Sequence, residues 1–522
     1  MSASGLHRSI THTELVVGAL RRWPAREAFR QDGHSWTYAQ TADQVARFAA
    51  VFQKRGLPRG HGIGLLSPNR PEVWMAQTAT AVAGGRYTAL HPAGSLPDHT
   101  YACDEAELRF LCVDPAYAER AGELLERSPS VEAVFTFGPS DVGEDLLALA
   151  EGMGPVALTP GPQGPDDTTW LLYTGGTTGV PKAAELSEHA IAQMTLAISA
   201  GWDLPKQRRY LACAPISHAA GTLITPTLMS GGSVVLHRSF DPGRWLGDMV
   251  TERPTLSLLV PTMIYVLLDH PSLDGTDFSA LETIMYGASP MSPARLAEGI
   301  ERIGPVFAQL YGQTECGAVA TSMWRAHHDP GDLKRLSSCG LPMPGARVEV
   351  FDADGRPVPE GEAGEICLQG PSVMKGYFKQ PELTAEAIVD GWLHTGDMAT
   401  RDDEGFLYIV DRKKDMIISG GFNVFPREIE DVLGTHPAVS AVAVIGVPDD
   451  KWGEAVKAIV VPRPGHEVAA DELIALVKKE KAASYAPKTV DVVDELPLTA
   501  VGKPDKKVLR ARYWGEGGRG VN

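Results

Sequence analysis

Short apolar runs alternate along this chain with stretches whose apolar residues recur at helical spacing. Ile63–Leu66 predicts a buried strand, and the next apolar stretch predicts a helix from about Glu72 to Val82 that Pro71 opens. Strands that are each followed by a helix are the pattern of layered α/β structure. The same order recurs at the strand Leu256–Val260 with the helix Pro261–Leu268, and at the strand Leu281–Met285 with the helix Pro293–Ile303.

From Arg347 to Leu368 the pattern changes to strands joined by turns. Val348–Phe351 and Gly364–Leu368 predict hairpin strands, and Asp352 to Gly355 supplies residue types that form tight turns. We therefore expect a small β subdomain at this point of the chain.

A charged cluster, Asp411-Arg-Lys-Lys-Asp415, separates two parts of the chain that look self-contained. We place the domain boundary there, although an exposed turn inside one domain is an alternative. Residues 1–411 should form a large α/β domain of layered α/β subdomains plus the small β subdomain, and residues 412–522 a smaller, mobile α+β C-terminal domain. After the cluster we expect strands at Met416–Ile418 and Val439–Ile445, and helices at Pro426–Leu433 and Asp471–Lys481.

Composition narrows the class of protein. A chain of 522 residues is too long for one core, and 43% hydrophobic with 22% charged residues is typical of soluble globular proteins. The net charge of −17 argues against nucleic acid as a partner. The six cysteines are scattered without a Cys-x-x-Cys pair, so we expect reduced thiols rather than disulfides or a zinc site. No apolar run approaches the roughly 18 residues of a membrane span. We therefore expect a cytoplasmic protein with no integral membrane contact.

The stretch Tyr173–Lys182 gathers glycines and hydroxyl residues into one loop that ends in a lysine. Such a loop offers unobstructed backbone N–H groups, hydroxyls and a cation to a polyphosphate. It is not a Walker A loop, because proline precedes the lysine and alanine follows it. Its candidate phosphate-binding residues are Thr174, Gly175, Gly176, Thr177, Thr178, Gly179 and Lys182.

Three motifs downstream make the loop more informative: Tyr311-Gly-Gln-Thr-Glu315, Thr395-Gly-Asp397 and Gly502-Lys503. Together with the loop, and in this order, they resemble the adenylate-forming superfamily, which includes acyl-CoA synthetases, aryl-CoA ligases, luciferases and peptide-synthetase adenylation domains. The resemblance covers nearly the whole chain. It implies activation of a carboxylic acid with ATP and Mg²⁺. Some acyl synthetases share Gly175 where the family usually has serine.

The resemblance assigns roles at the nucleotide site. It implies that Glu315 holds Mg²⁺, which prefers carboxylate and phosphate oxygens, and that Thr314 contacts the α-phosphate. Adenine would lie beside Tyr311 and the preceding small residues, and Asp397 would accept hydrogen bonds from the ribose. The remaining nucleotide-binding candidates are Gly287, Ala288, Ser289, Gly312 and Arg412.

Two half-reactions require two geometries, and the family meets this by rotating the small domain. Lys503 would bridge the carboxylate and the α-phosphate in the first state, and Lys414 matches the hinge. In the second state a segment of the small domain would line the tunnel for coenzyme A. Its candidates are Ser419, Gly420, Gly421, Trp452 and Glu454.

His218, in the frame Pro-x-x-His-x-x-Gly, resembles the gate between the acyl pocket and the thiol tunnel. The residues after it are small, and the facing wall would be the equally small Gly287–Ser289. Small linings leave volume, so we expect a bulky apolar acid: fatty, aromatic, or a polycyclic terpenoid or steroid acid. The pocket candidates are Ala219, Ala220, Gly221 and Thr222.

The sequence therefore predicts an ATP-dependent carboxylic acid:CoA ligase that forms an acyl-adenylate and then a thioester. Coenzyme A is the favoured acceptor, because the chain runs from the charged cluster into Met416–Gly421 without the insertion usual in ligases that load carrier proteins. The alternatives are a stand-alone acyl-AMP ligase that loads an acyl carrier protein, a luciferase-like oxygenase, and a non-catalytic adenylate-binding protein. A homodimer through the large domain is a family-level expectation.

Overall fold

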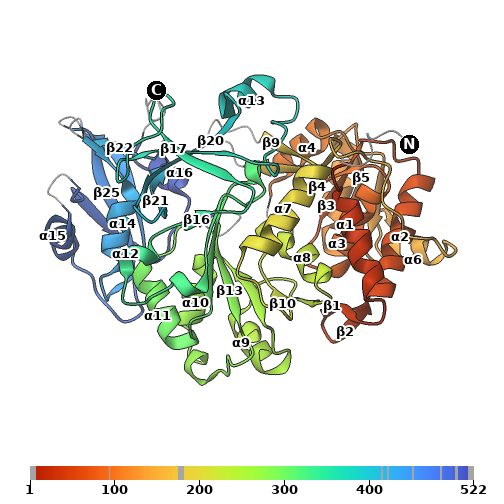
Figure 1. The fold of residues 1–522 in the computed structure, drawn as a ribbon, viewed down its shortest axis with the longest axis horizontal. Coiled ribbons are helices and arrows are strands. Elements are labelled where there is room, and N and C mark those ends of the chain that lie inside the picture. Colours follow the sequence, from red (N-terminus) through yellow and green to blue (C-terminus); the bar gives the residue numbers. More distant parts are fainter. Residues whose placement is uncertain are drawn as a thin grey trace.

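The computed structural model describes residues 8–92, 94–174, 182–412, 415–419, 422–449, 452–481, 485–499 and 504–514. Four sheets organise this described part, and Figure 1 colours their strands along the chain from red at the N-terminus to blue at the C-terminus. Two large sheets lie side by side, a smaller sheet follows them, and the last sheet is at the end of the chain. None of the helices described is both long and apolar enough to cross a bilayer.

The first large sheet has seven strands in the order β7-β6-β5-β3-β4-β8-β9. All its neighbours pair in parallel except β8 and β9, which form an antiparallel pair. Its strands are β3 (Gly62–Leu66), β4 (Arg86–Ala89), β5 (Leu108–Val113), β6 (Ala133–Thr136), β7 (Glu144–Asp145), β8 (Thr168–Thr174) and β9 (Lys182–Ser187), and its helices are α2 (Tyr38–Lys54), α3 (Pro71–Val82), α4 (Leu96–Glu105), α5 (Ala118–Arg127) and α6 (Leu146–Glu151).

The second large sheet has nine strands, with a parallel centre and antiparallel edges, in the order β16-β15-β14-β13-β12-β10-β11-β1-β2. Its strands are β1 (Glu27–Gln31), β2 (His34–Thr37), β10 (Arg209–Ala212), β11 (Ser233–Leu236), β12 (Leu256–Leu259), β13 (Thr283–Gly287), β14 (Phe307–Tyr311), β15 (Thr321–Met323) and β16 (Leu341–Pro342). Its helices are α1 (His12–Arg22), α7 (Glu188–Gly201), α8 (Ile224–Met229), α9 (Pro242–Thr251), α10 (Pro261–Leu268), α11 (Pro293–Ile303) and α12 (Leu333–Leu336), with short 3₁₀ turns η3 (Ala219–Leu223) and η5 (Thr314–Cys316).

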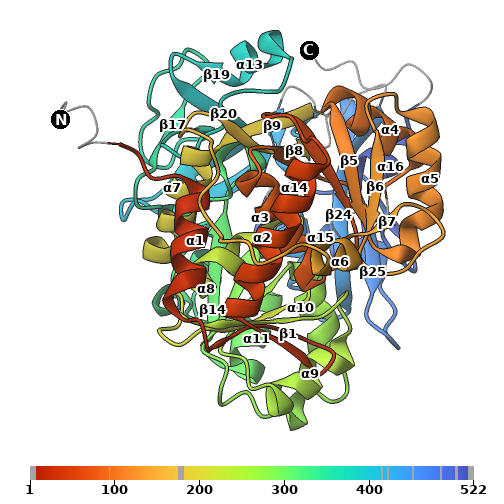
Figure 2. The same cartoon turned by 90° about the vertical axis from the view of Figure 1, so that its right-hand side faces the viewer.

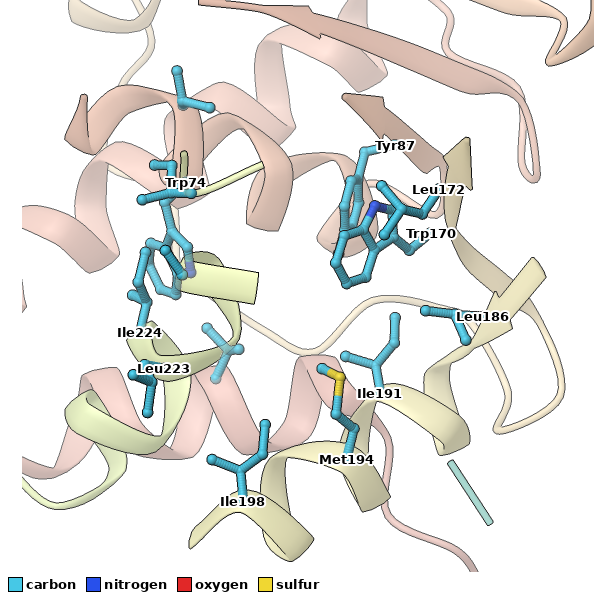
Figure 3. Close-up of a cluster of buried hydrophobic side chains, with 14 of the residues drawn as sticks. Trp74, Tyr87, Trp170, Leu172, Leu186, Ile191, Met194, Ile198, Leu223 and Ile224 are labelled. Atoms are coloured by element: carbon cyan, nitrogen blue, oxygen red, sulfur yellow. The ribbon is translucent and has the colours of Figure 1, made fainter. Parts of the chain in front are cut away.

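One apolar core joins the two large sheets. Figure 3 shows Tyr87 and Trp170 of the first sheet facing Ile191 and Met194 of α7. The rings of Tyr87 and Trp170 stack with centroids 5.4 Å apart. Separate buried clusters cover the outer faces, with α4 and α5 on the first sheet and α9, α10 and α11 on the second. Since both sheets are covered on both faces, their parallel strands can be apolar throughout.

The small β subdomain predicted after Arg347 is a five-stranded antiparallel sheet. It extends further along the chain than the sequence pattern indicated, as far as the charged cluster. Its elements are β17 (Arg347–Phe351), β18 (Gly364–Gln369), α13 (Pro381–Ala387), β19 (Ile388–Val389), β20 (Trp392–Arg401) and β21 (Leu407–Arg412).

The C-terminal part has a sheet and cores of its own. Its elements are β22 (Ile417–Ser419), β23 (Phe422–Val424), α14 (Pro426–Gly434), β24 (Val439–Asp449), β25 (Gly453–Pro462), α15 (Ala470–Glu480), β26 (Thr489–Val492) and α16 (Lys506–Ala511). In Figure 2 its blue strands β24 and β25 lie behind the orange and green layers of the larger part. It meets that part through Arg427 of α14, which donates a hydrogen bond to the carbonyl oxygen of Met291 at 2.6 Å.

Each predicted strand and helix named above is present in the structure, and their bounds differ by up to four residues. One of these displacements has a clear physical reason. The helix Pro293–Ile303 has the predicted bounds, whereas the strand expected at Leu281–Met285 lies two residues later, at Thr283–Gly287. The N–H of Leu281 bonds to the carbonyl of Phe278 in a turn, so pairing with β12 begins only at Thr283. The apolar residue types alone did not reveal that Leu281 lies in a turn before the strand.

The buried His328 should make the stability of this fold depend on pH. Its Nδ1–H donates to the carbonyl of Trp324 at 2.8 Å, and its Nε2 accepts from the hydroxyl of Tyr286 at 3.1 Å. Burial lowers its pKa to about 4. Because the unfolded chain binds this proton near pH 6.5, we expect the free energy of unfolding to fall by about 3 kcal/mol between pH 6.5 and pH 4.

Urea unfolding at several pH values checks this expectation. In His328→Gln the part of the pH dependence that His328 supplies should disappear, whereas in His466→Gln, where the histidine is exposed, the profile should match that of the unchanged protein. Equal pH profiles for the unchanged protein and His328→Gln would contradict the assignment.

Candidate active site

The parallel strands β13 and β14 end side by side at the carboxyl edge of the second large sheet, where binding sites form in open α/β sheets. β13 ends at Gly287 and β14 at Tyr311, and the two strands pair in parallel with Gly287 opposite Leu310. A Cβ at Gly287 would lie 2.2 Å from the carbonyl oxygen of Leu310, and the φ of Gly287 is +153°. Ala288 and Ser289 follow, both half-buried. These residues therefore lie close to Tyr311, which follows Leu310.

A hydrogen-bonded group joins β14 to β20 of the small β subdomain. The hydroxyl of Tyr311 and the amide of Gln313 donate to the same oxygen, Oδ2 of Asp397, at 2.7 and 2.8 Å. Gln313 also donates to the carbonyl oxygen of Thr395 at 2.7 Å. Asp397 is buried, so its carboxylate is held in place by these donors. The sequence assigned Tyr311 and Asp397 to one site but gave Gln313 no role.

The turn that carries Asp397 is fixed from β18. The hydroxyl of Thr395 donates to the carbonyl oxygen of Ile366 at 2.7 Å, and the N–H of Gly396 donates to Oε1 of Glu365 at 2.9 Å. Gly396 has a φ of +71°, which glycine adopts without the steric cost that other residues meet. The backbone thereby presents Asp397 to Tyr311.

A second group links Glu315 with the lysine that ends the glycine-rich loop. Nζ of Lys182 donates to the hydroxyl of Tyr377 at 2.6 Å, and that hydroxyl donates to Oε1 of Glu315 at 2.8 Å. The ammonium also lies 4.0 Å from the centroid of the Tyr377 ring. Burial and the neighbouring carboxylate raise the pKa of Tyr377, so its hydroxyl keeps its proton. The buried Glu315 offers hard oxygen ligands of the kind that Mg²⁺ prefers.

Tyr377 is a residue that the sequence analysis missed, and no local motif indicates it. The segment before it pairs with β9, since Glu185 N–H bonds to the carbonyl of Gly376 and Lys375 N–H bonds to the carbonyl of Glu185. That pairing, between positions about 190 residues apart, brings the ring beside Lys182.

The glycine-rich loop lies between two paired strands. Thr174 at the end of β8 pairs with Lys182 at the start of β9. The candidates Gly175, Gly176, Thr177, Thr178 and Gly179 lie outside the described residues, as does the side chain of Thr174. The described ends of the loop are therefore adjacent, and one of them contacts Tyr377.

His218 lies at the start of η3, where its Nδ1 is 2.8 Å from the hydroxyl of Ser217. Its ring meets the ring of His91 edge-on, with centroids 5.8 Å apart and planes at 67°. His91 follows β4 of the other large sheet, so the two histidines face each other where the sheets meet. The sequence analysis singled out His218 and missed His91, whose only signal is its position after a buried strand.

The four expected pocket residues differ in what they can line. Ala219 is half-buried, whereas Ala220 and Thr222 are buried, and the hydroxyl of Thr222 donates to the carbonyl oxygen of Ala219. A Cβ at Gly221 would lie 2.0 Å from the carbonyl oxygen of Ile216. The small size of Gly221 thus allows close backbone approach, and Ala219 is the position from which a larger side chain would reach outward.

The C-terminal candidates are partly described. Ser419 of β22 pairs with Gly453 of β25, which places it beside Glu454, and both Ser419 and Glu454 are buried. Trp452 is 38% exposed. Arg412 pairs through its backbone with Asp397, but its side chain is not described. Lys414, Gly420, Gly421 and Lys503 lie outside the described residues.

Cys316, beside Glu315, does not act as a nucleophile here. It is buried, its sulfur accepts from the N–H of Gln313 at 3.2 Å, and burial raises the pKa of its thiol to about 12. Because the thiolate is the reactive form, Cys316 is a packing residue. Gly312 and Thr314 of the same motif are half-buried.

Comparison with known families decides the class of this site. The model of the AMP-binding enzyme family matches residues 17–378, and the model of its C-terminal domain matches residues 428–503. The chain belongs to the AMP-binding enzyme family. This membership confirms the adenylate-forming superfamily that the motifs resembled.

Relatives within the AMP-binding enzymes agree. The chain is 47% identical to the medium/long-chain-fatty-acid–CoA ligase FadD8 of Mycobacterium tuberculosis, over 99% of this chain and 92% of that protein. It is 38% identical to a feruloyl-CoA synthase of Amycolatopsis, over 95% and 99% of the two chains. The amide bond synthetase McbA of Marinactinospora thermotolerans has a similar structure, with a TM-score of 0.89 at 33% identity over 97% and 100% of the chains.

These findings confirm the predicted fold class and the predicted acyl-CoA synthetase activity: this AMP-binding enzyme is an acid–thiol ligase with a large N-terminal and a smaller C-terminal part.

Asn69 holds the loop that carries His218, and its removal should be costly. Its side-chain amide donates to the carbonyl of Ala214 and its Oδ1 accepts from the N–H of Ile216, both at 2.9 Å. Asn69→Ala leaves these two buried backbone groups unpaired. We expect the free energy of unfolding to fall by about 2–4 kcal/mol and activity to fall with it. Chemical denaturation with parallel turnover assays measures both.

Asn69→Asp separates the two bonds. A carboxylate still accepts from Ile216, but it places an oxygen against the carbonyl of Ala214. If the free energy of unfolding of either variant equals that of the unchanged protein, Asn69 does not hold this loop.

Proposed function

We propose that this enzyme converts a bulky apolar carboxylic acid, ATP and coenzyme A into an acyl-CoA, AMP and pyrophosphate, with Mg²⁺ bound at Glu315. The observation that carries the proposal is the juxtaposition of two groups. Asp397, held by Tyr311 and Gln313, lies at one end of the Tyr311–Glu315 segment. Glu315, which Tyr377 links to Lys182, lies at the other end. The segment thus connects Asp397, which would accept hydrogen bonds from the ribose, with Lys182, which would face the phosphates.

In the first step a carboxylate oxygen attacks the α-phosphorus of ATP, and the bond to the bridging oxygen breaks so that pyrophosphate leaves. Mg²⁺ on the phosphate oxygens would neutralise charge that develops there. Asp397 accepts from the ribose hydroxyls, and Ala288 and Ser289 offer backbone beside adenine. Thr314 contacts the α-phosphate, the loop Thr174–Lys182 contacts the outer phosphates, and Lys503 bridges the acid and the α-phosphate.

In the second step the thiol sulfur of coenzyme A attacks the acyl carbon, the thioester forms, and AMP leaves as the thiol proton is released. The domain boundary at residue 411 and a hinge at Lys414 would let residues 412–522 withdraw Lys503 and bring Ser419–Gly421, Trp452 and Glu454 to the tunnel. The separate core of the C-terminal part supports this division, since a unit with its own core can move as a body.

A mixed panel of acids tests substrate and acceptor together. The enzyme is incubated with ATP, Mg²⁺ and fatty, aromatic or polycyclic acids, with and without coenzyme A, and the products are read by mass spectrometry. Acyl-CoA from one subset supports the proposal and identifies the class of acid. Acyl-AMP that accumulates and is not consumed by coenzyme A would favour loading of a carrier protein instead. We further propose a cytoplasmic homodimer, which light scattering tests for its oligomeric state.

Ala219 should set the size of the acid. Because it is half-buried beside His218, a larger side chain there would occupy the space of the acyl group. We expect Ala219→Trp to lower kcat/KM for the large substrate by about a hundredfold or more and to spare acetate-sized acids. Ala219→Gly, which removes volume, is the matched control and should keep the large substrate. Unchanged selectivity in Ala219→Trp would contradict the pocket assignment.

A further inference from the structure

Three side chains that can bind a metal, none of them assigned to the nucleotide, meet on one face of the small β subdomain. Cys367 of β18 is directly opposite His394 of β20 in the antiparallel register. Glu365 precedes Cys367 by two residues, so it points to the same face of β18. Sγ of Cys367 is 3.3 Å from Nδ1 of His394, which is 3.2 Å from Oε2 of Glu365. All three atoms lie within 4.8 Å of one another.

These separations fit the edges of a tetrahedron around zinc. With bond lengths of about 2.3 Å to sulfur and about 2.0–2.2 Å to nitrogen or oxygen, the sulfur–nitrogen edge would be about 3.6 Å and the nitrogen–oxygen edge about 3.4 Å. Two of the three edges are therefore already near their final length. The third edge, between Sγ of Cys367 and the carboxylate oxygen of Glu365, is no longer than 4.8 Å.

We propose that Glu365, Cys367 and His394 bind one zinc ion, with water as the fourth ligand. A thiolate and an imidazole together select a borderline-soft metal over Mg²⁺, so this site is chemically distinct from the one at Glu315. Cys367 is buried, whereas the side chains of His394 and Glu365 are 25% and 12% exposed, which leaves an approach from solvent on their side. On binding, the thiol gives its proton to solvent, so affinity rises with pH.

The site is supported from behind by the turn that precedes Asp397. Oε1 of Glu365 accepts from the N–H of Gly396 at 2.9 Å, while Oε2 is the oxygen that faces His394. The carboxylate can thus keep its backbone contact and offer its other oxygen to the metal. Such contacts orient a ligand and strengthen metal sites. Zinc binds here to the resting protein, whatever acid the enzyme activates.

Cobalt and zinc titrations test the proposal on the full chain. The protein is treated with EDTA, returned to chelator-free buffer and titrated with Co²⁺, whose tetrahedral thiolate complexes have a sulfur-to-cobalt charge-transfer band. We expect one equivalent of Co²⁺ to produce that band and one equivalent of Zn²⁺ to remove it. Competition with a chromophoric chelator gives the zinc affinity at pH 6.5 and pH 8. We expect zinc to bind more tightly at pH 8.

Variants separate this site from the other cysteines. The band should be lost in Cys367→Ser and in His394→Asn, and it should persist in Cys339→Ser, a buried cysteine elsewhere in the large domain. Glu365→Gln keeps an acceptor for the N–H of Gly396, so it should weaken zinc binding without unfolding the protein. If Cys367→Ser proves unfolded by circular dichroism, His394→Asn decides. Absence of a stoichiometric band in the unchanged protein, or a band that survives in His394→Asn, would overturn the proposal.

Discussion

Glu315→Gln should lower the rate of acyl-adenylate formation by about a hundred- to a thousandfold, or roughly 3–4 kcal/mol of transition-state stabilisation. Glutamine keeps the shape of the side chain and an oxygen for the hydroxyl of Tyr377, which donates to Oε1 at 2.8 Å. It removes the negative charge that would hold Mg²⁺ on the phosphates. Acid-dependent exchange of pyrophosphate into ATP measures this half-reaction, and raised Mg²⁺ should restore part of the rate.

Two matched variants serve as controls for the loss of rate in Glu315→Gln. Tyr377→Phe removes the hydroxyl between Lys182 and Glu315 but leaves both charges, so we expect about a tenfold loss. Glu404→Gln neutralises a carboxylate that is 64% exposed and should change nothing. If Glu315→Gln exchanged pyrophosphate at the normal rate with normal Mg²⁺ dependence, Glu315 would not be the metal ligand.

Lys503→Ala should separate the two half-reactions. A lysine that bridges the carboxylate and the α-phosphate stabilises charge only while the adenylate forms, so we expect that step to slow by at least about a hundredfold. Thioester formation from supplied acyl-AMP should be nearly unchanged. Pyrophosphate exchange and coenzyme A consumption, measured separately, check the two steps.

The control for Lys503→Ala is Lys507→Ala, which removes an exposed lysine from α16. It should leave both half-reactions intact. Equal losses of both steps in Lys503→Ala would contradict the proposal that this lysine serves one domain arrangement only.

The sequence predicted elements well where local signals coincide. The helix Pro293–Ile303 has Ser292 as N-cap, proline in its first turn and Gly304 directly after it, so its bounds could be read from the chain. β24 extends to Asp449, four residues beyond the expected end, because pairing with β25 continues past the apolar stretch. The end of such a strand depends on which strand pairs with it, and the local sequence does not show this.

The site was predictable to the extent that its residues lie in compact motifs. Tyr311, Glu315 and Asp397 could be assigned together, whereas Tyr377 reaches Glu315 only because its segment pairs with β9. Gly221 shows a different limit. A small residue in a sequence can indicate an open pocket or a backbone in close contact, and only the distance to Ile216 distinguishes the two.

The attachment of Asp397 to Tyr311 and Gln313 also bears on how this enzyme tolerates genetic variation. The three residues connect two sheets. A nucleotide bound at this proposed site would stabilise the folded chain by mass action, by about 2.7 kcal/mol at a hundredfold excess over its Kd. Substitutions that weaken this connection would then be silent while ATP is abundant. When the ATP concentration falls, such variants would lose this stabilisation and unfold more readily. Energy starvation would therefore lower the amount of folded enzyme in variants that behave normally in rich medium.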